Sequence, residues 1–257
     1  MSNSPLVDFT LISPNRTVPR NHTIDTVTIH CVAGQCTAES LGELFFQPSR
    51  GASSNYGVDK HGRIGMYVEE KDRSWCSGGR DENGMPIEVN GISGSENDHR
   101  AITIEVASDT RDPYTVTPAA YEGLIRLLVD ICKRNPGIKR LRWQGDRSLV
   151  GQVEKQNMTV HRWFAYKACP GDYLYSRHAD IAAEVNRRLD SEQIQVKEET
   201  TVAKEWWEEP LAWAQENEII YGDENGDLKL DEPCTRRQMI TFLYRLFKLI
   251  MKMIGGK

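Results

Sequence analysis

The chain has 257 residues, of which 39% are hydrophobic and 27% charged, and its net charge is −5. This composition indicates a globular protein with one sizeable core, or one core and a small module, and it excludes disorder over the whole length. The negative charge gives no indication of a nucleic-acid partner, because such proteins present basic surfaces.

The N-terminal segment Met1–Asp8 has neither the basic region nor the apolar stretch of a secretory signal. The longest apolar run, residues 242–254, is interrupted by Arg245, Lys248 and Lys252 and is too short to span a membrane. We therefore expect synthesis in the cytoplasm without a signal peptide. The six cysteines are irregularly spaced, so no disulfide framework is expected.

Four segments of the first half are predicted as strands. Thr26–His30 alternates and is β-branched, which favours a strand. Ser54–Asp59 and Ile64–Val68 are predicted strands on either side of a turn at Lys60–Gly62. Ala101–Val106 is the strongest strand signal, and its apolar character suggests a central strand that is apolar on both faces.

Three helices are predicted between and after these strands. Leu41–Phe46 is a short one. Thr117–Arg134 is amphipathic, with Thr117 as N-cap and Pro118 in the first turn. Tyr173–Leu189 is the last helix of this part. The alternation of strands and helices predicts an α/β domain over residues 1–190, with a central mixed β-sheet flanked by helices.

The C-terminal part has a different composition. Residues 191–204 are polar and charged, which is typical of a linker. Residues 205–257 are predicted to form a small α-helical module, with two helices around a loop that contains Gly222 and Gly226.

The segment that begins at Thr159 carries the most chemistry. His161 and Cys169 lie eight residues apart, and the cysteine is followed by Pro-Gly. Cysteine thiolate and neutral histidine are zinc ligands, and His30 at a strand end would complete three, leaving a fourth position for water as in catalytic zinc sites. Residue type alone leaves packed or surface roles open for all three.

Five ordered segments resemble one known family. They are Thr28–His30, Ser53–Arg63, Arg73–Trp75, Asn97–Glu105, and His161 with Lys167–Asp172. In this order and spacing, the first 190 residues resemble the zinc N-acetylmuramoyl-L-alanine amidases of the phage-lysozyme and peptidoglycan-recognition type. The whole is most similar to an endolysin or prophage amidase of Gram-positive bacteria.

The resemblance implies roles for individual residues. His30, His161 and Cys169 would bind Zn²⁺, which would activate a water to cut the amide between N-acetylmuramic acid and L-alanine. Tyr56 would orient that water or donate to the oxyanion, and Lys167 would stabilise the oxyanion.

Glu105 would act as general base, or would fix the tautomer of a histidine ligand without binding the metal itself. Trp75 and Trp163 would contact the substrate. Where many relatives have Trp-His-Ala, this chain has Trp75-Cys76-Ser77, which leaves the substrate contacts there undefined.

Other interpretations of these side chains stay open. Tyr56 would equally suit a packed aromatic, and Lys167 a solvated surface charge. Glu105 could form a structural ion pair with an arginine such as Arg100. Buried core is an equal alternative for Trp75 and Trp163.

Residues 205–257 resemble a single S-layer-homology module. The matching parts are Trp213–Gly222, Gly226–Pro233 and Thr235–Arg245. About 50 residues bury too little surface to be stable alone, and the second helix is apolar on more than one face. We therefore expect this module to pair with a copy from another chain, giving a homo-oligomer, or to dock on the first domain. Its ligand would be a secondary wall polymer.

The leading hypothesis is thus a cell-lysis amidase with peptidoglycan as substrate, acting at the wall after release through a holin. Three alternatives are a non-catalytic peptidoglycan receptor, an S-layer-like attachment protein and another zinc hydrolase such as a peptidase. Receptors of this type typically lose the cysteine ligand, so the presence of Cys169 favours catalysis.

Overall fold

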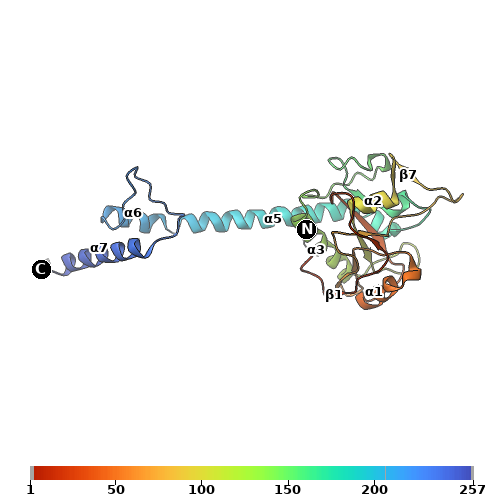
Figure 1. Cartoon of the computed structure of the whole chain (residues 1–257), viewed down its shortest axis with the longest axis horizontal. Helices are drawn as coiled ribbons and strands as arrows, with labels where there is room; N and C mark the ends of the chain where they lie inside the picture. Colours follow the sequence, from red (N-terminus) through yellow and green to blue (C-terminus); the bar gives the residue numbers. More distant parts are fainter. Residues whose placement is uncertain (1–2, 206, 256–257) are drawn as a thin grey trace. The chain divides into compact units, whose positions relative to one another are not determined.

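The computed structural model describes residues 3–205 and 207–255, with residues 193–205 described by their backbone alone. The chain divides into two compact units, Met1–Ser191 and Glu192–Lys257 (Figure 1). Within the described residues, no helix combines the length and the apolar character that crossing a membrane requires.

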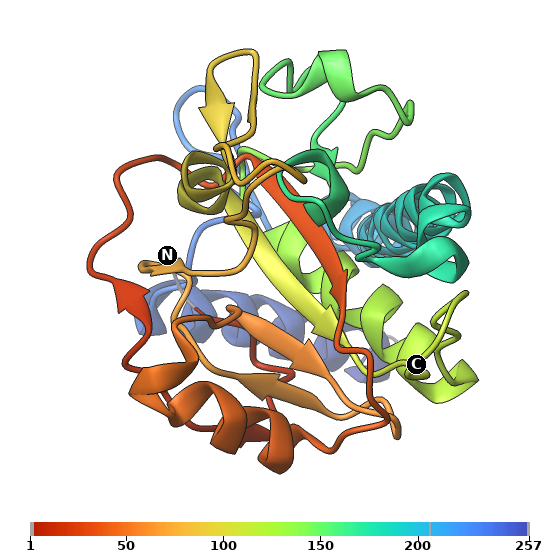
Figure 2. The same ribbon diagram turned by 90° about the vertical axis from the view of Figure 1, so that its right-hand side faces the viewer.

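A six-stranded mixed sheet forms the centre of the first unit (Figure 2), which confirms the predicted fold class. The strand order is β1-β5-β4-β9-β3-β10. The two longest strands, β3 and β9, pair in parallel over six residues each, and β4 and β10 extend this parallel part. Strand β5 runs antiparallel to β4. The bounds are β1 Phe9–Thr10, β3 Thr26–Cys31, β4 Tyr56–Val58, β5 Ile64–Met66, β9 Ala101–Val106 and β10 Met158–Thr159.

Two small ribbons and several helices complete this unit. The ribbons pair β2 (Arg16–Thr17) with β6 (Arg73–Ser74) and β7 (Glu88–Val89) with β8 (Ile92–Ser93). The helices are α1 Ala38–Phe46, α2 Gly94–Arg100, α3 Pro118–Arg134, α4 Gly171–Tyr175 and α5 His178–Glu205, and the 3₁₀ turns are η1 Pro48–Arg50, η2 Arg147–Leu149 and η3 His161–Trp163. Helix α3 begins as predicted, with the Thr117 hydroxyl accepting from the Ala120 amide at 3.0 Å.

The main core lies on one face of the sheet. There, alternate residues of β3 and β9 pack against the apolar faces of α3 and of the first turns of α5. The residues that meet are Val27, Ile29, Ile102, Ile104, Leu124, Leu127, Leu128, Ile181 and Val185. The expectation that Ala101–Val106 is apolar on both faces is wrong, because Thr103 and Glu105 alternate with the isoleucines and lie on the opposite face.

Helix α5 continues beyond Leu189, where its end was predicted, and runs through residues 191–204 to Glu205. This stretch is polar, but it contains no proline or glycine and is rich in Glu, Gln and Lys, which favour helix. The polar composition of residues 191–204 led to the prediction of a linker, but their backbone is helical. The division into a catalytic domain, a linker and a module stays a prediction.

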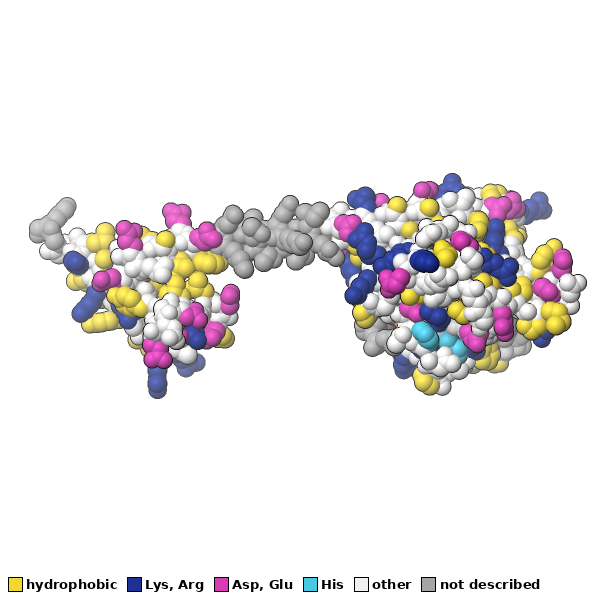
Figure 3. Space-filling view, turned by 90° about the horizontal axis from the view of Figure 1, so that it is seen from above, with side chains coloured by type: hydrophobic (Ala, Val, Ile, Leu, Met, Phe, Trp, Pro, Cys, Tyr) yellow, Lys and Arg dark blue, Asp and Glu magenta, His cyan; other side chains and the backbone are white. Residues whose placement is uncertain are grey.

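The second unit contains α6 (Glu208–Glu216) and α7 (Arg236–Gly255), with a loop between them that holds Gly222 and Gly226. Apolar side chains gather on the surface of this unit (Figure 3). The exposed ones on α7 include Ile240, Leu243, Phe247, Ile250 and Ile254.

Candidate active site

The polar face of the sheet carries the site, and strand periodicity places its residues there. His30 on β3 is in register with Glu105 on β9, so both side chains leave the same face. Two residues earlier, Thr28 is in register with Thr103 on that face, and Thr159 of β10 is in register with Thr28. The alternate residues of β3 and β9, such as Ile29 and Ile104, point to the opposite face and belong to the main core. One alternating pattern therefore separates the chemistry from the core.

Three side chains converge beside this face. Ligand atoms of His30, His161 and Cys169 all lie within 4.8 Å of one another. The Nδ1 atom of His30 is 3.4 Å from Cys169 Sγ, and the two imidazole rings are 5.1 Å apart at their centroids. His161 starts the turn η3 after β10, and Cys169 precedes α4. The trio predicted from sequence is thus brought together by three separate segments.

The surroundings of the trio fit a metal ion. Burial lowers the pKa of His161 to about 4 and that of His30 well below its usual value, with the neighbouring His161 adding to the second effect. Both rings are therefore neutral and able to ligate at neutral pH. The Nε2 atom of His161 is buried and has no hydrogen-bond partner among the described residues. A cation at this point would satisfy that nitrogen and compensate a buried thiolate.

Glu105 lies next to the trio. Its Oε1 atom accepts a long contact of 3.8 Å from the Cys76 thiol, and its Oε2 atom is buried without a partner in the described part of the chain. Burial raises the pKa of Glu105 to about 8. His30, Cys76 and Glu105 also have ligand atoms within 4.8 Å of one another. The Glu105 carboxyl group therefore lies beside the cluster of His30, His161 and Cys169, with a pKa close to neutral pH.

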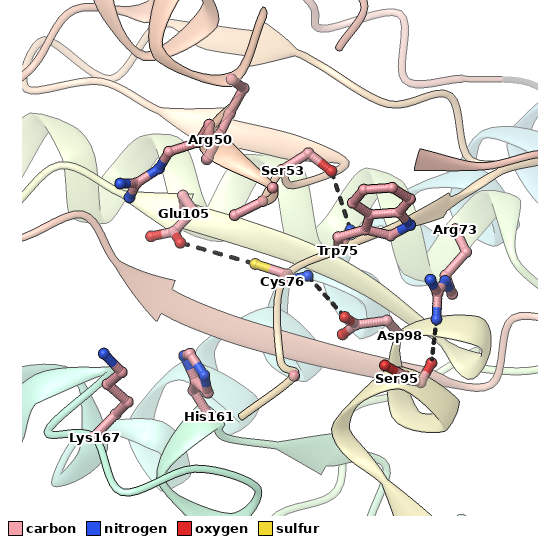
Figure 4. Close-up of a pocket in the computed structure, with 14 residues that line it drawn as sticks. Arg50, Ser53, Arg73, Trp75, Cys76, Ser95, Asp98, Glu105, His161 and Lys167 are labelled. Atoms are coloured by element: carbon pink, nitrogen blue, oxygen red, sulfur yellow. Dashed lines mark hydrogen bonds between the residues drawn. The ribbon is translucent and has the colours of Figure 1, made fainter. Parts of the chain in front are cut away.

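A cavity of about 510 Å³ is lined by Glu105 and His161. Figure 4 shows Glu105 on one side of it, with His161 and Lys167 facing it from the other. Trp75 also lines the cavity and is 37% exposed, with its ring nitrogen donating to Thr17 Oγ1 at 2.9 Å. Two arginines that the sequence analysis did not assign, Arg50 and Arg73, line it as well.

Comparison with known proteins decides the family. The family model described as N-acetylmuramoyl-L-alanine amidase matches residues 20–172, more than half of the chain. The chain belongs to this amidase family. No curated protein matches the chain as a whole or in part.

One solved structure supports the fold of the first unit, and two others with lower scores are also similar to it. The selenomethionine derivative of AmpD is 18% identical with a TM-score of 0.50, over 71% of this chain and 99% of AmpD. A mutant endolysin from Bacillus subtilis is 16% identical, with a TM-score of 0.45 over 70% of this chain and 99% of the endolysin. The endolysin LysCS from Clostridium intestinale URNW is 17% identical, with a TM-score of 0.43 over 72% and 99%.

Tyr56 does not reach the site of this amidase, which corrects its predicted role. It is in register with Ile104, so its side chain leaves the core face of the sheet, away from Glu105. The residue is fully buried, and its hydroxyl donates to Glu70 Oε1 at 2.7 Å and accepts from the Ser4 amide at 2.9 Å. The side chain packs in the core, because successive residues of a strand point to opposite faces and Tyr56 stands at a position that points to the core face.

Trp163 is also placed away from the cavity, so the predicted substrate contact is corrected. It is 5% exposed and stacks on Trp143, with ring centroids 5.3 Å apart and an interplanar angle of 3°. It belongs to a small core cluster with Phe164 and Val160. The ring is therefore core, the alternative that the sequence left open.

The ion pair considered between Glu105 and Arg100 does not form. Arg100 instead forms an ion pair with Asp25, at 2.6 Å between Nη2 and Oδ2. Sequence reasoning also missed Asp98, whose buried carboxylate lines the cavity and accepts from the amides of Cys76 and Ser77 at 2.8 Å each. A signal was present, because Asn97 and Asp98 are polar residues that come shortly before the predicted strand Ala101–Val106.

Proposed function

We propose that this amidase hydrolyses the bond between N-acetylmuramic acid and L-alanine in peptidoglycan, with a zinc ion held by His30, His161 and Cys169. The convergence of these three ligands beside an open cavity carries the proposal. Membership of the N-acetylmuramoyl-L-alanine amidase family supports the bond that is cut. Two imidazoles and one thiolate form a ligand set that suits zinc and leaves a position free.

Zinc at this site would polarise the scissile carbonyl and lower the pKa of a water ligand towards about 7. Glu105 is the group that takes a proton during attack and returns it to the leaving amine. Its pKa, raised by burial to about 8, suits both steps near neutral pH. Lys167, facing the cavity across from Glu105, supplies positive charge to the developing oxyanion.

The cavity walls suit a glycopeptide. Trp75 presents a half-exposed ring on which a sugar or a peptide side chain would stack. Arg50 and Arg73 line the same cavity and are suited to peptide carboxylates. These features favour a substrate with a sugar ring, whose C–H face can stack on Trp75, and with negative charges, as a muramyl peptide has.

The test is mass spectrometry of the products released from purified peptidoglycan. We expect fragments with a free L-alanine amino terminus from the wild type and none from Cys169→Ser. Cys234→Ser is the matched control, because Cys234 is exposed and lies in the second unit. Products cut at another bond, or full activity of Cys169→Ser, would refute the proposal.

A non-catalytic peptidoglycan receptor is the second candidate function. Its binding would not need a complete ligand set, whereas this chain brings both histidines and Cys169 together. If the protein were such a receptor, purified walls would retain it without releasing any amidase product.

For the second unit we propose wall attachment and self-association. Its helix α7 exposes Ile240 by 66%, Leu243 by 59% and Phe247 by 59%, which is costly for a monomer in water. Residues 205–257 would act as an S-layer-homology-like module that binds a secondary wall polymer and pairs with a second copy. Light scattering of the full chain and of Phe247→Glu would show a dimer or larger oligomer for the first and a smaller species for the second.

In the cell, we propose an endolysin role. The protein would be made in the cytoplasm and reach the wall through a holin. Co-expression with and without a holin, followed by culture turbidity, tests this separately from the enzymatic activity. Lysis that does not depend on a holin would contradict the release route.

A further inference from the structure

The short helix α2 contributes a buried asparagine that joins the two strands leading to the histidine ligands. Asn97 is 2% exposed. Its Nδ2 donates to Thr28 Oγ1 at 2.9 Å, and its Oδ1 accepts from Thr159 Oγ1 at 3.0 Å. The two threonine oxygens are themselves 2.7 Å apart. Three polar side chains from three segments therefore form one closed ring.

The direction of every hydrogen bond in this ring is determined. The amide oxygen of Asn97 can only accept, so the Thr159 hydroxyl gives it its single hydrogen, and the Thr28 hydroxyl must therefore donate to Thr159. Each member donates once and accepts once within the ring. Removing one hydroxyl breaks the cycle and leaves a buried donor or acceptor without its partner.

The ring of Asn97, Thr28 and Thr159 lies at the position where the backbone pairing between β3 and β10 ends. Strand β10 pairs with β3 at only two positions, and the second of these joins Thr159 to Thr28. His30 lies two residues beyond Thr28 on the same face, and His161 lies two residues beyond Thr159, after the ladder has ended. The spacing of the two imidazoles therefore depends on the threonine pair and on Asn97, because no backbone ladder joins the two segments at the histidines themselves.

Asp98, the next residue of α2, binds the loop that contains Cys76 and Ser77. The Asp98 carboxylate accepts from the backbone amides of Cys76 and Ser77 at 2.8 Å each (Figure 4 shows the first). This fixes the loop so that Ser77 Oγ lies 3.4 Å from His30 Nε2 and the Cys76 thiol lies 3.8 Å from Glu105. His30 Nδ1 faces Cys169, and the tautomer that leaves Nδ1 free to ligate carries its proton on Nε2, where Ser77 Oγ lies within reach to accept it.

We propose that Asn97 and Asp98 are positioning residues of the metal centre, Asn97 by fixing the spacing of the two histidines and Asp98 by presenting Ser77 to His30. The inference rests on the proposed zinc site. Neither residue contacts the metal ligands directly, and each acts through a partner. The consequence is that zinc affinity depends on groups that are not ligands.

The decisive experiment uses matched variants of Thr159 in the full chain. Thr159→Val keeps the shape and removes the hydroxyl, whereas Thr159→Ser keeps the hydroxyl. Zinc affinity is measured by competition with a chromophoric chelator. We expect Thr159→Val to weaken zinc binding by about 10–100-fold, as for other groups that orient metal ligands. Thr159→Ser should remain near the wild type.

Asn135→Ala controls for lost stability. Asn135 is 3% exposed and bonded to Glu70 and to the Ile131 carbonyl, on the core side of the sheet. It should lower the melting temperature without changing zinc affinity, whereas Asn97→Ala should lower both. Equal zinc affinities for Thr159→Val, Thr159→Ser and the wild type would overturn the role of Asn97, even if Asn97→Ala does not fold.

Asp98 is tested through its two amide bonds. Asp98→Asn retains an oxygen acceptor for the amides of Cys76 and Ser77, whereas Asp98→Ala removes it. We expect weaker zinc binding for Asp98→Ala and for Ser77→Ala, with recovery in Asp98→Asn. Unchanged affinity in Ser77→Ala would overturn the role of Asp98. A wild-type protein that binds no zinc would instead refute the proposed function.

Discussion

The placement of Tyr56 in the core gives a prediction that separates structure from catalysis. Tyr56→Phe removes only the hydroxyl and keeps the ring, which is fully buried among core residues. If the hydroxyl served the reaction, its loss would slow turnover. If it serves the core, its loss lowers stability and leaves turnover unchanged for each folded molecule.

The size of the stability effect follows from the contacts. The hydroxyl donates to the Glu70 carboxylate, and a hydrogen bond to a charged group contributes about 1.5–3 kcal/mol. The Ser4 amide loses its acceptor and is left buried, at a cost of about 1–3 kcal/mol. Glu70 keeps Arg134 at 2.6 Å and Asn135 at 3.2 Å, so its charge stays paired. We therefore expect a loss of about 3 kcal/mol in the free energy of unfolding.

Urea denaturation and turnover on purified peptidoglycan are measured side by side. Tyr67→Phe is the matched control, because Tyr67 is equally buried and its hydroxyl donates only to the neutral Ala38 carbonyl at 2.8 Å. It should cost about 1–2 kcal/mol. A fall of about 10²–10³ in kcat for Tyr56→Phe, the size expected for a lost oxyanion donor, together with unchanged stability, would refute the core assignment.

Further predictions concern other parts of the amidase unit. Burial lowers the pKa of His178 to about 4, below the about 6.5 of the unfolded chain, so the unfolded state takes up the proton first and stability falls by about 3 kcal/mol as the pH drops between these values. His178→Phe should flatten this part of the curve of unfolding free energy against pH, and an unchanged slope would contradict the assignment. Trp163→Ala should lose about 3–5 kcal/mol with normal turnover per folded molecule, whereas Trp75→Ala should raise KM with little change in melting temperature; the reverse pattern would restore Trp163 to the substrate site. Lys167→Met should lower kcat with little change in zinc affinity, and Lys155→Met, at an exposed loop, should change neither; equal kcat for both variants would remove Lys167 from the mechanism. Chelation at neutral pH should abolish activity, and added zinc should restore it; activity that survives complete metal removal would contradict a zinc mechanism.

Strand positions could be predicted because local pattern determines them. Thr26–Cys31 and Ala101–Val106 are rich in β-branched residues, and α3 carries its own N-cap at Thr117. The end of α5 could not be predicted in the same way, since residues 191–204 are polar without being helix breakers.

The candidate site was predictable only as a set of residue types. His30, His161 and Cys169 were identified through spacing and family resemblance, and they do converge. Tyr56 and Trp163 belong to the same motifs, but one side chain leaves the opposite face of the sheet and the other stacks on Trp143. A motif fixes sequence neighbours, whereas the face on which a side chain emerges depends on the register of its strand.

The sequence by itself determined the fold class and the residue types proposed as ligands, because both depend on short-range pattern and on residue chemistry. Only the tertiary structure decided which polar side chains reach the cavity and which stay in the core. It also showed that Asn97 and Asp98 connect β3, β10 and the loop at Cys76. The physical reason is that a buried hydrogen bond joins residues far apart in the chain, and its partners are set by how the strands pack.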